Sequence, residues 1–178
     1  MKSPDTRLEE LIRRIICSIC LKTPDPQIRY SETEAKFYVR VNTSDQGRCV
    51  GKQGRNHWAI NAIMWYAGLS LKRQPVVVKL EDPMGEGFRA SIPFKANPRW
   101  DKAAMADLVE LILSCVFGDA GHAWVIDETT PEAVVRIQLD RYLKNNCVDP
   151  DIVEALQKVI HAAGMASGAL LNVEVTWK

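Results

Sequence analysis

The order of hydrophobic patterns along the chain is the feature that most limits how it can fold. In the first half, apolar residues recur at helical spacing in some segments and alternate with polar residues in others. The elements that these patterns predict are helices over residues 5–21, 42–50 and 55–67 and strands over residues 27–30, 35–41 and 76–80. Pro24 and Pro26 are expected to end the first helix, and Gly68 the third. This order predicts an α+β domain over residues 5–82, with helices packed on a three-stranded sheet.

The second half repeats most of this order. Its patterns predict helices over residues 101–117 and 150–165 and strands over residues 123–127, 133–139 and 170–177. Prolines interrupt residues 83–102, which we interpret as a linker before a second α+β domain over residues 103–178. The repeated order favours an internal duplication in which the two units pack together. A chance succession of similar elements is the alternative.

Composition and motifs argue against several classes of protein. Charges interrupt the apolar segments, and residues 1–10 lack the apolar centre of a signal peptide, so we expect a cytoplasmic protein with no membrane partner. The five cysteines are expected to be reduced thiols. Cys17 and Cys20 are expected in or beside the core, because a structural zinc needs four ligands. Since no nucleophile elbow, Walker or zinc-protease motif appears, we expect no enzymatic activity, no cofactor and no metal.

Charge is distributed unevenly along the chain. Lys and Arg exceed Asp and Glu by five in residues 1–90, whereas Asp and Glu are in excess by four in residues 91–178. A basic first half would attract phosphate, and an acidic second half would repel it. Ordinary variation of surface composition is the alternative explanation.

A pair of glycines joins two of the predicted helices, in the segment Gly51-Lys52-Gln53-Gly54. Glycines permit a tight turn and let a nucleic-acid backbone approach closely, and the first amides of the next helix favour a phosphate. Arg48, Lys52 and Arg55 surround this turn with cations. The spacing alone is weak evidence, because Gly118-Asp119-Ala120-Gly121 repeats it between a predicted helix and a predicted strand. There we expect an ordinary turn.

The run from Asp45 to Arg55, DQGRCVGKQGR, resembles the signature of type II KH domains. It is most similar to the small bacterial KH proteins of the KhpA type, and the αββααβ order of residues 6–82 agrees with that family. The resemblance implies a loop that holds about four nucleotides of single-stranded RNA, and no DNA. The residues that it assigns are the loop, Gly51, Lys52, Gln53 and Gly54, and the preceding turn and groove wall, Gly47, Arg48 and Val50.

The second unit departs from this pattern. Residues 140–149 occupy the place of the loop but contain no glycine pair. Asp149 and Asp151 stand at the start of the next predicted helix, where a phosphate would sit. We therefore expect a KH-like unit that lacks the GxxG loop, binds no RNA in the KH manner and packs against the first unit.

The helix after the loop carries two further features. His57 directly follows the loop, so we include it among the candidate RNA contacts. Trp58, Ala62 and Trp65 form a stripe at helical spacing. We interpret the stripe first as an interface with a protein partner or a second copy, next as core, and last as a platform on which bases stack.

The sequence thus predicts a non-catalytic protein that binds single-stranded RNA, as a post-transcriptional regulator or an RNA chaperone. One alternative is a protein-interaction adaptor whose KH fold binds RNA weakly or not at all. Another is a ribosome-associated or ribosome-assembly factor. The complete glycine loop favours RNA binding, whereas the small net charge of +1 and the acidic second half favour the adaptor.

Overall fold

The structure is a computed structural model of the 178-residue chain. The residues that it describes are 4–72, 74–81, 101–118, 121–129, 132–140 and 150–178. Residues 83–100 of the predicted linker therefore lie outside the described residues. So do residues 141–149, where the second unit was predicted to lack the loop.

The described part of the first half contains three α-helices and a three-stranded sheet. Its elements are α1 (Pro4–Ile19), β1 (Gln27–Ser31), β2 (Lys36–Arg40), α2 (Thr43–Val50), the 3₁₀ turn η1 (Lys52–Gly54), α3 (Arg55–Lys72) and β3 (Val77–Leu80). β1 pairs with β2 in antiparallel fashion, and β2 pairs with β3 in parallel. A parallel pair needs a long connection, which α2, η1 and α3 supply. The glycine loop therefore lies within this crossover.

The described part of the second half follows the same pairing scheme with a shorter crossover. Its elements are α4 (Lys102–Val116), β4 (Gly121–Thr129), β5 (Glu132–Leu139), α6 (Pro150–Ser167) and β6 (Leu170–Trp177). β4 pairs with β5 in antiparallel fashion, and β5 with β6 in parallel. The fold is thus α+β, as the sequence predicted, and is compatible with a KH-like arrangement.

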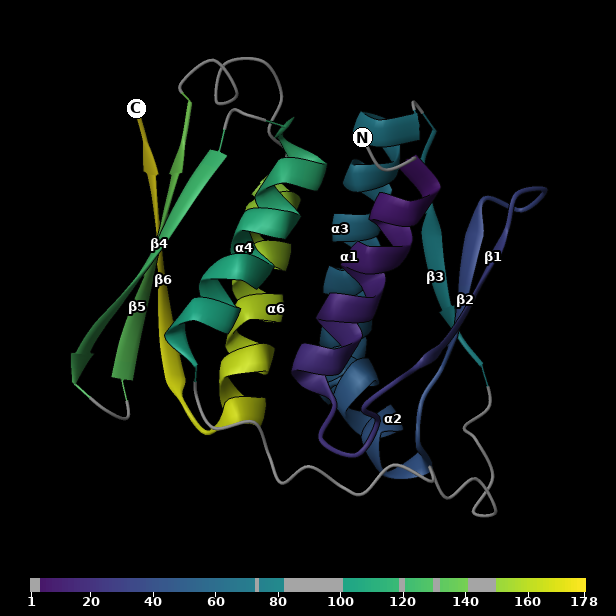
Figure 1. The fold of residues 1–178 in the computed structure, drawn as a ribbon, viewed down its shortest axis with the longest axis horizontal. Coiled ribbons are helices and arrows are strands. Elements are labelled where there is room, and N and C mark those ends of the chain that lie inside the picture. The colour runs from purple at the N-terminus through teal and green to yellow at the C-terminus, as the bar shows by residue number, and fades with distance from the viewer. Residues whose placement is uncertain (1–3, 73, 82–100, 119–120, 130–131, 141–149) are drawn as a thin grey trace.

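The two sheets and the two pairs of long helices form four layers (Figure 1). α1 and α3 lie beside the first sheet, α4 and α6 lie beside the second, and the helix pairs face each other in the middle. Arg7 of α1 donates a hydrogen bond of 3.1 Å to Ser114 Oγ of α4. Buried apolar side chains from both halves form one continuous cluster. The described parts of the two halves therefore share a single core.

α1 contributes a whole helical face to this core. Its fully buried side chains, spaced to lie on one side of the helix, are Leu8, Leu11, Ile12, Ile15 and Ile16. Burying each contributes roughly 1.5–3 kcal/mol relative to exposure. Pro4 begins the helix, a position where the missing N–H of proline has no consequence. The helix ends at Ile19, so Pro24 and Pro26 do not set its end as the sequence suggested.

The prediction that Gly68 ends the third helix is wrong. α3 continues to Lys72, and Gly68 is buried within it. A Cβ atom at this position would lie 2.7 Å from the carbonyl oxygen of Gln74 and 2.8 Å from the backbone nitrogen of Val76. The glycine therefore lets the chain that enters β3 pass directly across the helix. Its small size, rather than a left-handed conformation, explains its presence.

The connections of the second half also refine the predictions. β4 extends to Thr129 and β5 begins at Glu132, so the connection expected over residues 128–132 is shorter than predicted. The strands stay paired toward the turn, with a register shift between Asp127 and Thr129. α4 ends at Val116 and β4 begins at Gly121, so Gly118 follows a helix and Gly121 begins a strand, as expected for the second glycine pair.

Replacing Gly68 by alanine tests the close approach at α3. We expect Gly68→Ala to lower the free energy of unfolding by about 1–3 kcal/mol, because the new methyl group is forced against backbone atoms. Gly47→Ala is the control: a Cβ there meets nothing within 4 Å. Alanine in that helix should stabilise by roughly 0.5–1 kcal/mol. Urea unfolding measures both, and an unchanged or raised stability of Gly68→Ala would refute the close approach.

Candidate functional site

The glycine loop joins α2 to α3 through three conformations that favour glycine. Gly51 has φ +70°, Gln53 has φ +57° and Gly54 has φ +76°. A Cβ at Gly51 would lie 2.6 Å from Cγ of Asn56, whereas one at Gly54 would meet nothing within 4 Å. Gly51 is therefore required for space and for conformation, and Gly54 for conformation alone. Gln53 adopts the left-handed region without being glycine, which makes it the strained residue of the loop.

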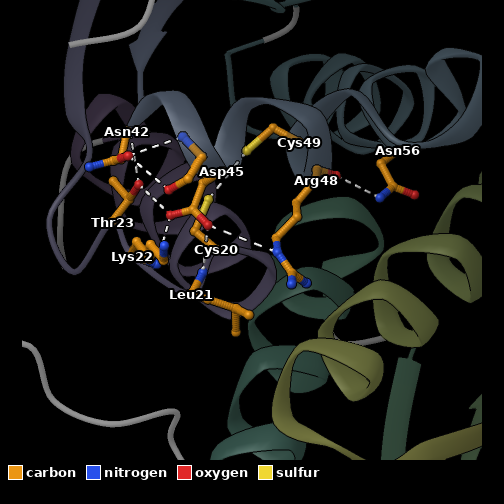
Figure 2. A network of polar contacts seen from close by, with 10 residues as sticks. Cys20, Leu21, Lys22, Thr23, Asn42, Asp45, Arg48, Cys49 and Asn56 are labelled. Carbon is orange, nitrogen blue, oxygen red and sulfur yellow. Dashed lines mark hydrogen bonds and ion pairs between the residues drawn. The ribbon is translucent and has the colours of Figure 1, made fainter. Parts of the chain in front are cut away.

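Two hydrogen bonds and one side chain hold the loop closed. The Gly51 amide donates to the Gly47 carbonyl at 2.8 Å, and the Gly54 amide donates to the Gly51 carbonyl at 3.2 Å. Asn56, in the first turn of α3, donates from Nδ2 to the Arg48 carbonyl oxygen at 2.8 Å (Figure 2). The two helices are thus tied across the loop by Asn56. This role of Asn56 was not predicted from the sequence, in which it is simply an asparagine two residues after the second glycine.

Asp45 anchors the start of α2 to the end of α1. Its carboxylate is 1% exposed and accepts hydrogen bonds from the backbone amides of Leu21 at 3.0 Å and Lys22 at 2.7 Å. It also accepts one from the Thr23 hydroxyl at 2.7 Å, and that hydroxyl oxygen in turn accepts from the Asn42 amide at 2.9 Å (Figure 2). A buried carboxylate with several donors is a stable arrangement. The chain after α1 and the first turn of α2 are therefore joined by one buried carboxylate.

Asn42 begins α2 as the sequence predicted. Its side-chain oxygen accepts a hydrogen bond from the Ser44 amide at 3.0 Å, so Asn42 is the N-cap of this helix. Asp45 lies in the first turn, and its role in fixing α2 was not anticipated. An aspartate in the first turn of a helix is commonly explained by the helix dipole alone, so burial was not evident from the pattern.

Two cysteines pack between α1 and α2. The Sγ atoms of Cys20 and Cys49 lie 3.3 Å apart, and both residues are buried. The hydrogen bond with Cys49, and then burial, raise the pKa of the Cys20 thiol well above its usual range. Burial likewise raises the pKa of the half-buried Cys17. The expectation that Cys17 and Cys20 are packed thiols is confirmed. Among the described residues no group of three potential ligands could hold a metal ion.

The cations predicted around the loop are on the surface. Arg48, Lys52 and Arg55 are all exposed. Arg48 is held beside the buried network, with its Nε 4.0 Å from Oδ1 of Asp45. Val50, the last residue of α2, is 38% exposed. Lys52 and Gln53 begin η1, where the first amides have no intrahelical acceptor. The arrangement combines open amides, exposed cations and glycines, which together suit an anionic backbone.

His57 points toward the sheet. Its Nε2 lies 3.1 Å from the carbonyl oxygen of Val78 in β3 and 3.1 Å from Nδ2 of Asn61. Asn61 completes the contact: it accepts from the Val78 amide at 2.7 Å and donates to the Val78 carbonyl at 3.1 Å. His57 and Asn61 thus fasten α3 to the edge of β3. This placement gives His57 a clear structural role, whereas the other candidate residues gather at the loop.

The stripe on α3 is only partly buried. Trp58 is 40% exposed and Trp65 is 44% exposed, and Ala62 between them is half-buried. The interpretation of the two tryptophans as core residues is therefore wrong. The face of α3 that enters the core is a different one, made of Ala59, Ile60, Ile63, Met64 and Ala67. None of the helices in the described part of the chain is long and apolar enough to cross a membrane.

Replacing Asp45 tests the anchor beneath the loop. Asp45→Ala leaves two backbone amides and a hydroxyl without their acceptor, so we expect the free energy of unfolding to fall by about 2–4 kcal/mol. Asp25→Asn is the control. Asp25 is exposed and pairs with Arg13 at the surface, so its change should stay within about 0.5 kcal/mol. Chemical denaturation of both variants measures the free energy of unfolding. Equal stability of Asp45→Ala and wild type would disprove the anchoring role.

Comparison with known proteins identifies a relative of this chain. No family model matches the chain, and no solved structure does. The chain is similar to the RNA-binding protein KhpA of Bacillus subtilis (strain 168), with 33% identity over 72 residues. These residues are 39% of this chain and 89% of the relative. The resemblance to KhpA-type proteins is thus confirmed, and on a match that spans nearly the whole relative the chain belongs to the KhpA family.

Proposed function

We propose that this protein binds single-stranded RNA through the loop between α2 and α3. The residues that would hold the RNA backbone are Gly51, Lys52, Gln53 and Gly54, with Gly47, Arg48 and Val50 before them and Arg55 after them. One observation carries the proposal. The loop combines two left-handed glycines with three exposed cations, Arg48 before it, Lys52 within it and Arg55 at the start of α3. That is the combination that lets a phosphate chain approach backbone amides.

The comparison supports the same function. The relative is named as an RNA-binding protein, and this chain matches nearly all of it. We accordingly propose a non-catalytic role, with about four nucleotides across the loop. His57 would contact the RNA through Nδ1, because its Nε2 contacts β3 and Asn61.

We further propose that the chain consists of two KH type II-like units, over residues 5–82 and 103–178. Both described sheets pair one antiparallel and one parallel neighbour in the same order, which supports this division. The second unit would lack the loop, since residues 140–149 contain no glycine pair. RNA would then be held by the first unit alone.

A charge reversal at the loop tests the proposed function. We expect Lys52→Asp/Gln53→Asp to abolish binding of short single-stranded RNA, because two carboxylates would occupy the phosphate position. This pair is preferable to substitutions at Gly51, where a side chain would strike Asn56 and disturb the loop itself. Aspartate also tolerates the left-handed conformation of Gln53 better than most residues. Fluorescence anisotropy at stated salt measures the affinity.

A matched control lies at another helix start. Lys102→Asp/Ala103→Asp changes the charge by the same amount at the first turn of α4, where both residues are exposed. It should leave RNA binding unchanged. Undiminished binding by the folded loop variant would remove the loop from the site. If the wild-type protein has no affinity for any RNA pool, the adaptor alternative is favoured instead.

A further inference from the structure

Trp58 and Trp65 of α3 stay exposed in the part of the chain that the structure describes. Trp58 and Trp65 lie outside the cluster of buried apolar side chains that joins the two halves. The buried face of α3 already packs within that cluster, against α4 and α6 among others. A flat aromatic side chain that is two-fifths exposed retains a costly contact with water, and such residues commonly mark a binding surface. Leu69, 40% exposed, continues the same side of the helix.

The stripe begins where the proposed RNA loop ends. Arg55 is the first residue of α3, and Trp58 follows it by less than one turn. At a rise of 1.5 Å per residue, Trp65 lies about 10 Å further along the helix, roughly the length of three stacked nucleotides at 3.4 Å each. A strand held at the loop by its phosphates can therefore reach both rings by continuing along the helix.

Charge on this segment favours a polyanion over a second copy. Between Asp45 and Glu81 the sequence contains no Asp or Glu, and three exposed cations, Arg48, Lys52 and Arg55, lie at the loop end of the stripe. A second copy packed stripe to stripe would bring these cations together, which like-charge repulsion opposes. RNA fits both features at once, because its phosphates suit the cations and its bases stack on the rings.

We propose that Trp58 and Trp65 form a base-stacking platform that extends the RNA site beyond the loop along α3. This inference rests on the proposed function of the loop. The platform predicts a site larger than the loop, with affinity that rises as the RNA becomes long enough to reach the second ring. Stacking tolerates any base, so the extension adds affinity with little dependence on sequence.

RNA of two lengths tests the platform in the full chain. Trp58→Ala/Trp65→Ala should weaken binding of a ten-nucleotide oligouridine by at least roughly 5-fold. Binding of a four-nucleotide oligouridine, which the loop alone can hold, should stay within about 2-fold of wild type. Trp58→Phe/Trp65→Phe keeps a ring at each position and should restore most of the lost affinity. NMR titration measures the weaker affinities.

The matched control removes exposed apolar surface elsewhere. Met165→Ala/Leu170→Ala changes two residues that are 60% and 51% exposed in the second half, and it should bind both RNAs as wild type does. If the loop variant loses both RNAs while the tryptophan-to-alanine variant binds the longer RNA normally, the platform is refuted and the loop stands. If wild type binds neither RNA, both proposals fail. If the alanine variant changes only the molecular mass in solution, the stripe joins copies of the chain, which also overturns the platform.

Discussion

The packing of α1 and α3 against α4 and α6 is the constraint on which the rest of the structure depends. A three-stranded sheet can cover one side of the helices that cross it, and it leaves their other apolar side open. In this chain the helices of the second half cover that side, and the hydrophobic cluster runs through both halves. Because α3 is fixed by this core and by β3, the loop at its start has a rigid support. The buried anchor at Asp45 fixes the other end, through α2.

Much of this fold could be predicted from the sequence because its elements carry strong patterns. The stripe of α1 and the alternation of β2 each point to one structure, and β6 was predicted with its observed bounds, Leu170–Trp177. Gly68 shows why the end of α3 could not be predicted. A glycine within a helix and a glycine that ends one look alike in sequence, and only the crossing of residues 74–76 distinguishes them.

In the candidate site too, some residues could be predicted from the sequence and others could not. The loop residues follow from a local motif, and the structure brings them together as neighbours in one chain segment. The residues that hold the loop in place do not follow from a local motif. Asp45 bonds to the turn after α1, and Asn56 bonds back to α2 through a carbonyl group. Such contacts join segments that are distant in sequence or use backbone atoms, and no pattern of side-chain types reveals them. His57 is the converse case, since its position beside the loop suggested RNA while its ring faces β3.

The helices α4 and α6, which cover the apolar side of α1 and α3, belong to the same polypeptide as the helices that they cover. Such a cover does not dissociate on dilution, so the folded state does not depend on protomer concentration as that of an obligate dimer does. This arrangement also sets the number of glycine loops that one molecule can present to RNA. A symmetric pair of chains would present two such loops and could gain avidity on a long RNA, whereas the described part of this chain presents one loop of this kind. Under the proposed function, a single chain would gain affinity through further contacts beside this loop.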